Sequence, residues 1–340
     1  MDNINNEIEN IKGTLKDLYG VVNDLIKVIK EEQEQRILSN KAVLMQNAIL
    51  GNYMYELNDP EREKPDYFYP KFRSDEETIR LIVEEGKSLG RFGDGEFSIA
   101  FDIQRQPFQK PNEKLKQRIW QVLRTENDKY IIGIAKNYGS LERYNTFTAD
   151  GIRCYMTEEV RKMHREILSP EMIYTDAYIS RPYVIHKDND TDAPLKRFER
   201  LKTIWDNKDI IMVEGAQTRL GVGNDLFDNA KKIRRILAPA TNSFDKYDDI
   251  LGKCIEIGSE CDMFLLAIGP SAGVLAFDLA EKGYQAVDIG HLDLEYEWLL
   301  AGEGQRTEIP HKYNNEMDGG GNVLEIEDEK YLSQIISRFD

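Results

Sequence analysis

Near the start of the chain, apolar residues recur at spacings that alternate between four and three positions. The series is Ile4, Ile8, Ile11, Leu15, Leu18, Val22, Leu25 and Ile29. This seven-residue repeat is typical of helices that associate in a coiled coil. It predicts an oligomerisation helix over residues 1–36 and a homo-oligomer held together through residues 4–29. An amphipathic helix that lies on its own domain would show the same stripe.

Beyond residue 36 the heptad pattern is lost, although residues 37–57 still favour a helix. The next stretch, "NDPEREKPDYFYPKF" (58–72), holds three prolines and many charges. Prolines and charges together are typical of a linker. We therefore expect residues 37–73 to be a helical and irregular linker, and residues 74–340 to form the main domain.

In the main domain, short apolar runs alternate with helical patterns. Ser74, followed three residues later by Glu77, forms a capping box at a helix start. The runs predict buried strands at 129–135, 208–215, 262–269 and 285–290, and helices at 74–90, 157–168, 224–237 and 271–283. This alternation predicts an α/β fold with a Rossmann-like, mostly parallel sheet flanked by helices.

Composition and charge limit the classes of partner. Of the 340 residues, 41% are hydrophobic and 31% are charged, and the net charge is −16. Nucleic acid and anionic lipid both attract basic surfaces, so the sequence predicts no nucleic-acid partner and no docking on such membranes. A phosphorylated ligand would need a local metal ion, a few arginines or a helix N-terminus.

The sequence also indicates the compartment. It contains no run of about 18 apolar residues, so we expect no membrane span. The acidic, polar N-terminus is unlike a secretory signal. The three cysteines are an odd number and form no CxxC pair. These features predict a reduced, cytoplasmic protein.

Ligands of open α/β sheets bind beyond the carboxyl ends of the strands. One loop expected there, "GRFGDGE" (90–96), contains Asp94 and Glu96 with glycines at 93 and 95. Two carboxylates one residue apart in a turn can reach one Mn²⁺ or Mg²⁺ ion, and phosphate oxygens can complete its shell. A solvated surface turn is the alternative.

A second loop, "IGPSAG" (268–273), leads from a strand into a helix. Its backbone N–H groups and the helix dipole could bind a diphosphate near Gly269 and Ser271. The same residues match G-x-S-x-G, the nucleophile elbow of serine hydrolases, although no suitable Asp and His follow it. Ser271 could also simply cap the helix.

Two further segments carry arginines. In "TRLGVGND" (218–225), Arg219 could pair with phosphate, and Gly223 permits a close backbone approach. Asn224 could contact the ligand or cap a helix. In "YISRPYV" (178–184), Arg181 could bind phosphate or a sugar acid, or could be a buried structural arginine.

The last loop, "DIGHLDLEYEW" (288–298), gathers His291, Asp293, Glu295 and Glu297. A helix here would place Asp293 and Glu297 on one face. A histidine or carboxylate in this position could act as a general base. An acidic helix start favoured by the dipole would look the same.

Five separated blocks together resemble the GT-D-type glycosyltransferases. They are "RFGDGEF", "SRPY", "EGAQTRLGVGNDLF", "RILAPATNSFDKYDDIL" and "IGPSAGVLAFDLAEKGYQAVDIGHLDLEYEW". The family was first described as a domain of unknown function, in bacterial enzymes that extend the glycans of serine-rich adhesins. The resemblance covers residues 74–335 and leaves the heptad segment outside.

The resemblance implies a Rossmann-like transferase with a metal-binding Asp-x-Glu, matched here by Asp94 and Glu96, and a UDP-sugar donor, most simply UDP-glucose. The acceptor would be a hydroxyl of a glycan or glycoprotein. The other roles are our inference from the residues. The donor-binding candidates are Arg91, Gly93, Arg181, Arg219, Gly223, Asn224, Gly269 and Ser271, and the catalytic candidates are His291, Asp293 and Glu295. The alternatives are a serine hydrolase and a non-catalytic coiled-coil scaffold.

Overall fold

The N-terminal unit of the chain is one long helix. The computed structural model describes residues 2–57, 69–103, 108–314, 316–317, 320–321 and 323–339. It divides into two compact units, residues 1–54 and 55–340. Helix α1 (Asp2–Leu57) has 56 residues and passes without a break through the expected boundary at residue 36. No helix among the described residues is long and apolar enough to cross a membrane.

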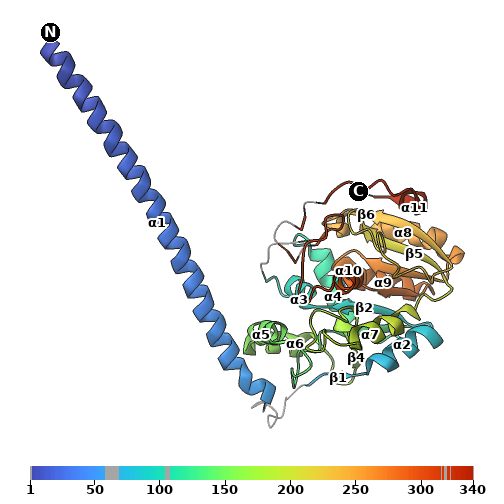
Figure 1. Ribbon diagram of the computed structural model, residues 1–340. Coiled ribbons are helices and arrows are strands. Elements are labelled where there is room, and N and C mark those ends of the chain that lie inside the picture. The colour runs from blue at the N-terminus through green and yellow to red at the C-terminus, as the bar shows by residue number, and fades with distance from the viewer. Residues whose placement is uncertain are drawn as a thin grey trace. The chain divides into compact units, whose positions relative to one another are not determined.

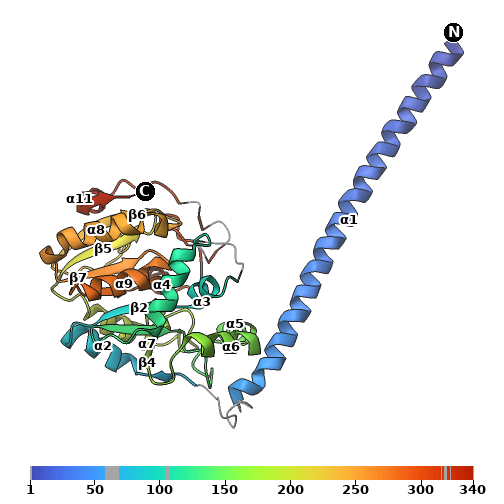
Figure 2. The same ribbon diagram turned by 180° about the vertical axis from the view of Figure 1, so that it is seen from behind.

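The second unit is built on a sheet of nine strands that all run parallel (Figures 1 and 2). Their order across the sheet is β1-β4-β3-β2-β8-β7-β5-β6-β9. The strands are β1 (Lys71–Phe72), β2 (Ser88–Phe92), β3 (Tyr130–Ile134), β4 (Ile173–Asp176), β5 (Asp209–Gly215), β6 (Lys232–Ala238), β7 (Met263–Ala267), β8 (Ala286–Asp288) and β9 (Ile335–Arg338). The prediction of an α/β fold with a largely parallel sheet is therefore confirmed.

Helices cover both faces of this sheet. Buried residues of α4, α8 and α9 join one apolar cluster, and those of α2, α7 and α10 join the other. The helices are α2 (Asp75–Glu84), α3 (Asp94–Ala100), α4 (Glu113–Arg124), α5 (Thr146–Tyr155), α6 (Glu158–Ile167), α7 (Ala193–Lys202), α8 (Tyr247–Ile257), α9 (Ser271–Glu281), α10 (Leu292–Ala301) and α11 (Glu329–Gln334). Successive residues of a strand enter opposite clusters, as the pleat requires.

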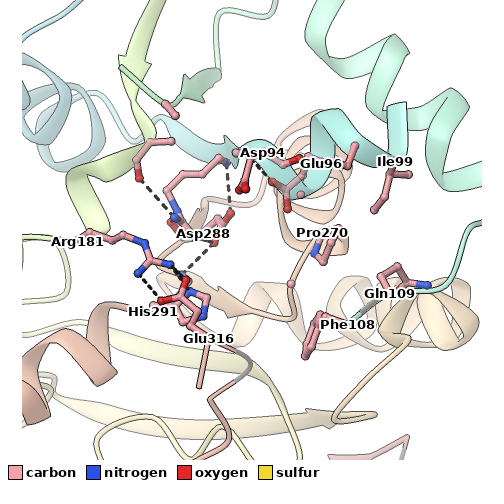
Figure 3. A pocket seen from close by; sticks show the side chains of 18 of the residues that line it. Asp94, Glu96, Ile99, Phe108, Gln109, Arg181, Pro270, Asp288, His291 and Glu316 are labelled. Carbon is pink, nitrogen blue, oxygen red and sulfur yellow. Dashed lines mark hydrogen bonds and ion pairs between the residues drawn. The ribbon is translucent and has the colours of Figure 1, made fainter. Parts of the chain in front are cut away.

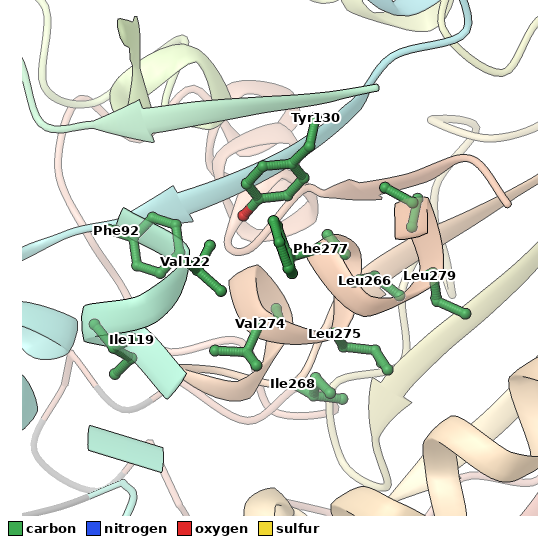
Figure 4. Close-up of a cluster of buried hydrophobic side chains, with 14 of the residues drawn as sticks. Phe92, Ile119, Val122, Tyr130, Leu266, Ile268, Val274, Leu275, Phe277 and Leu279 are labelled. Carbon is green, nitrogen blue, oxygen red and sulfur yellow. The ribbon is translucent and has the colours of Figure 1, made fainter. Parts of the chain in front are cut away.

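Helix α9 is the most deeply buried helix next to the sheet, and it packs directly on β2 (Figure 4). The close approach depends on Gly90. A Cβ at this position would lie 2.9 Å from the Cα of Gly273 and closer still to the Tyr130 hydroxyl. That hydroxyl donates to the Gly273 carbonyl oxygen at 2.8 Å, which satisfies a polar group inside an apolar contact. The contact fixes the start of α9 beside the end of β2.

The structure confirms the four expected strands and corrects two expected helices. The helix expected at 74–90 ends at Glu84, and Ser88–Phe92 is strand β2. Residues 224–237 do not form a helix, because Lys232–Ala238 is strand β6, paired along its length with β5. The first three residues of β6 are exposed or partly buried, and its last four are buried. The apolar residues of 224–237 recur at a helical spacing by coincidence. The predicted caps at Ser74 and Thr157 are both confirmed.

A buried ion pair ties β5 to β6 below the site. Arg235 donates to Glu214 at 2.6 Å, and both side chains are buried. Glu214 also accepts the backbone N–H of Leu220 at 2.6 Å, in the loop that follows β5. Burial raises the pKa of Glu214, and the Arg235 guanidinium opposes this effect. The pair therefore anchors the loop by holding a charge inside the fold.

We expect Arg235→Leu to lower the free energy of unfolding by about 3–5 kcal/mol, because it leaves the Glu214 carboxylate buried without its cation. Denaturant unfolding would measure this loss. The double variant Glu214→Gln/Arg235→Leu removes the charge, keeps an acceptor for Leu220, and should regain much of it. An equally unstable double variant would show that the pair is not the cause.

Candidate functional site

A cavity of about 1520 Å³ opens at the carboxyl edge of the sheet. Its lining comes from the segments that follow six strands, namely β2, β3, β4, β5, β7 and β8. The long loop after α10 and helices α3 and α5 complete the wall. The ligand site therefore lies where the parallel topology predicts.

The two acidic residues of "GDGE" lie at the start of α3, which immediately follows β2 (Figure 3). Asp94 is exposed to the cavity. Glu96 accepts the N–H of Gly93 at 2.6 Å and so fixes the turn between strand and helix. Burial raises the pKa of Glu96 to about 7, and the nearby carboxylates of Asp288 and Asp94 add to the effect. The turn thus gathers negative charge that is costly without a cation.

Arg91, one residue before the end of β2, is tied to Asp288 at the end of β8. Its Nη2 lies 2.7 Å from Asp288 Oδ1, and its Nε donates to the Asp288 carbonyl at 2.9 Å. Gly290 packs against the guanidinium, where a Cβ would lie 1.9 Å from Nη2. Burial raises the pKa of Asp288, and Arg91 opposes that rise. Arg91 is thus a fixed cation in the cavity wall.

A second cationic group in the lining is centred on Arg181 (Figure 3). Arg181 donates through both terminal nitrogens to Glu316, which Arg306 also approaches to 3.1 Å. Burial alone would raise the pKa of Glu316, but the charge of Arg181 holds it well below its usual range. The Glu316 carboxylate thus forms ion pairs with two arginines that line the cavity, Arg181 and Arg306.

His291 contacts this group as well. Arg181 Nη2 lies 3.3 Å from His291 Nδ1. A guanidinium can only donate, so Nδ1 accepts and a neutral His291 carries its proton on Nε2. The contact with Arg181 holds the His291 ring in the cavity wall.

The lining fits a hard divalent cation whose coordination shell is completed by oxygen atoms from outside the protein. Among the described residues, no group of three or more His, Cys, Asp or Glu side chains could hold a metal alone. The lining nevertheless holds seven carboxylates and four arginine or lysine side chains. Oxygen donors with excess negative charge suit Mg²⁺ or Mn²⁺ coordinated partly by phosphate oxygens. Asp94 and Glu96 are the residues that fit this task.

Asp293 reaches the cavity but is firmly paired. Lys312 lies 2.6 Å from both Asp293 and Glu297, which share one face of α10 as expected. Asp293 also accepts from the Gly221 N–H at 2.9 Å and from Asn224 at 2.8 Å. Three groups therefore orient its carboxylate, namely Lys312, Gly221 and Asn224.

Glu295 corrects a catalytic prediction, because it lies outside the cavity lining. Its side chain is fully buried and accepts the N–H groups of Tyr183 and Val184 at 3.0 and 2.9 Å. Burial raises its pKa to about 7. Glu295 therefore holds the backbone after Arg181, and it has a structural role.

Four of the expected donor-binding residues also lie outside the lining, namely Arg219, Gly223, Asn224 and Ser271. Arg219 donates to the carbonyls of His311 and Leu324 at 2.9 and 2.6 Å, so it anchors the loop after α10. Asn224 caps no helix and instead bridges Asp293 and Glu297. The other four, Arg91, Gly93, Arg181 and Gly269, do line the cavity.

The serine hydrolase alternative does not fit this geometry. Ser271 is fully buried, and its Oγ lies 3.0 Å from Ser243 Oγ. A nucleophile elbow must present its serine at the surface of the site. Of the "GPSAG" loop, the cavity lining includes Gly269 and Pro270 but not Ser271.

The sequence did not predict the site residues that come from loops far away along the chain. Glu316 and Lys312 complete the charge pairs of Arg181 and Asp293. Phe108 and Tyr313 place two rings 5.7 Å apart in the lining. Each belongs to a segment without a recognisable motif, so spacing gave no signal for them.

Comparisons with known proteins show which family the chain belongs to. Residues 89–317 match the family described as glycosyltransferase GT-D fold. The chain is 32% identical to "Glycosyltransferase GlyD" of Streptococcus pneumoniae serotype 4 over 86% of its own length and 37% of that protein. It is 32% identical to "Probable glycosyl transferase Gly" of Streptococcus gordonii over 77% of its length and 38% of that protein. The chain thus spans less than two fifths of these relatives.

Solved structures show the same fold. A structure described as a new glycosyltransferase (DUF1792) from Streptococcus sanguinis superposes with a TM-score of 0.74 and 31% identity, covering 80% of this chain and all of that one. A second, described as domain of unknown function 1792 with a distinct glycosyltransferase fold, gives a TM-score of 0.72 and 30% identity over 86% of this chain and 99% of the other. With the family match over two thirds of its length, this chain belongs to the glycosyltransferase GT-D fold family.

Proposed function

We propose that the chain transfers a sugar, most simply glucose, from a UDP-sugar to a hydroxyl of a glycan or glycoprotein. The bond from the anomeric carbon to the diphosphate breaks, the acceptor oxygen forms the new bond, and the products are the glycoside, UDP and a proton. The observation that carries the proposal is the acidic turn at Asp94 and Glu96, which opens onto a large cavity in a chain of this family.

Asp94 and Glu96 are the residues that would hold Mn²⁺ or Mg²⁺. The ion supplies charge neutralisation for the leaving diphosphate. The raised pKa of Glu96 supports this assignment, because a carboxylate that is costly to ionise gains most from a bound cation. Its hydrogen bond to Gly93 orients one of its oxygens before any ligand arrives.

Positive groups on two sides of the acidic turn are suited to the phosphates. Arg91 is held in place by Asp288, and the first turn of α9 begins just after Gly269 and Pro270. Helix N-termini and fixed guanidinium groups both stabilise phosphate oxygens. Arg181 can join them when the ligand displaces Glu316. We assign His291 and Asp293 to hydrogen bonds with sugar hydroxyls.

We expect Asp94→Asn to lower metal-dependent release of UDP from UDP-glucose by about 10²-fold or more, because it removes a charged ligand of the cation. The release rate over a Mn²⁺ titration measures this effect. The matched control is Asp248→Asn on α8, whose exposed carboxylate pairs with Lys114 and lies outside the cavity lining. Turnover in Asp94→Asn equal to the control at every Mn²⁺ concentration would contradict the metal assignment.

We also propose that α1 associates with copies of itself, while the cytoplasmic location remains a prediction. At 56 residues the helix is about 84 Å long. Taken by itself it leaves its heptad side chains exposed, including Leu15, Leu18 and Leu25 at 56–59%. An isolated helix with such a stripe gains stability only by burying it. The stripe supports a homo-oligomer through residues 4–29, of which residues 4 and 8 have undescribed side chains.

Removal of residues 1–36 should convert the protein to a smaller species in sedimentation velocity. Leu18→Lys/Leu25→Lys should have the same effect, since it puts two charges into the apolar stripe. The control is Asp17→Lys/Asp24→Lys, which adds the same two lysines one position outside the stripe. If all three variants sediment with the oligomer size of the parent chain, α1 is not the oligomerisation element.

A further inference from the structure

The cavity is larger than one ligand needs. Its volume of about 1520 Å³ exceeds the roughly 300–1,000 Å³ of most single-ligand sites. The acidic turn and Arg91 occupy the part that follows β2 and β8. A separate wall is built by helix α5 and by the ends of β3 and β4.

One face of α5 lines this wall. Phe147, Thr148, Gly151 and Tyr155 all contribute, and their spacing puts them on the same side of the helix. Phe147 is 77% exposed, the most exposed of the large apolar side chains in the described residues. An exposed apolar ring in a cavity lining is available to a ligand, and binding pockets are lined by such rings.

Gly151 is a second unexplained residue on this face. It lies inside α5, where glycine costs about 1 kcal/mol relative to alanine. A Cβ at this position would meet no other atom within 4 Å, so packing does not require the glycine. The missing side chain instead leaves the helix surface open to the cavity. A flat ligand could lie directly against the backbone there.

Asn137, just beyond the end of β3, supplies the polar group. Its side chain is buried and lines the cavity, yet its Oδ1 has no hydrogen-bond partner in the described part of the chain. Its amide is hydrogen-bonded to the Tyr178 hydroxyl, so one end of the amide stays unsatisfied whichever way it is turned. A buried amide without its partner costs about 1–3 kcal/mol, and a ligand hydroxyl would remove that cost.

We propose that this wall is the acceptor subsite, a proposal that rests on the function given above. A sugar ring of the acceptor glycan lies over Gly151 with its apolar face on Phe147, and one of its hydroxyls donates to Asn137 Oδ1. The subsite is continuous with the donor site, because Asp94, Asn137 and Gly151 line the same cavity. The acceptor therefore approaches from the β3 and β4 side.

The test uses Gly151→Leu in the full chain. The helix should not lose stability, since leucine favours a helix and meets open space. The ratio of transfer to para-nitrophenyl glycosides over hydrolysis of UDP-glucose should fall about ten-fold, through a higher acceptor KM. The matched control is Gly252→Leu in α8, another helical glycine with an open Cβ direction but outside the cavity.

Asn137 gives an independent readout. Asn137→Ala should raise the acceptor KM about five-fold or more, whereas Asn137→Asp keeps an oxygen acceptor and should stay closer to the parent. An acceptor KM in Gly151→Leu equal to that of Gly252→Leu would overturn the subsite. So would failure of the parent protein, with UDP and Mn²⁺, to bind any of the glycosides in saturation-transfer NMR while it hydrolyses UDP-glucose. Failure to bind or hydrolyse UDP-glucose at all would instead overturn the proposed function.

Discussion

Every strand of the sheet runs in one direction, and this constraint determines where chemistry can occur. All carboxyl ends meet at one edge, so each loop that leaves a strand there can reach its neighbours. The Arg91–Asp288 ion pair is the central contact. It links the ends of β2 and β8, which are adjacent in the sheet but far apart in the sequence. This ion pair is surrounded by the acidic turn, the start of α9 and the loop to α10.

A close contact between helix α9 and the sheet holds the neighbourhood of this ion pair in place. Gly90 lets α9 lie directly on β2, and the Tyr130 hydroxyl satisfies the Gly273 carbonyl inside that contact. The start of α9 is thereby held next to the turn at Asp94. The diphosphate of the proposed donor would gain from this rigidity, because preorganised donors cost no rearrangement when charge develops. Stability and function therefore depend on the same contact.

The sequence allowed us to predict features formed by neighbouring residues, but not contacts between residues that are far apart in the chain. Asp94 and Glu96 were found because both lie in one turn that glycine spacing reveals. The inward direction of Ser271 follows from how α9 is rotated on the sheet, which tertiary packing decides. Glu316 meets Arg181 across 135 residues, and no local pattern records such a pair. The strand at 232–238 was taken for helix because its pairing with β5, not its own spacing, determines its conformation.

Charge pairing within the cavity bears on the order of binding. Each arginine or lysine of the described lining already has a carboxylate partner, as Arg181 has Glu316 and Lys116 has Asp102. A diphosphate that arrived alone would add negative charge to a lining in which carboxylates are already in excess. In the proposed function, a divalent cation bound at Asp94 and Glu96 before the donor, or together with it, would reverse this balance. Under the proposed function, the donor therefore binds as its metal complex, and Glu316 leaves Arg181 only after that charge has entered.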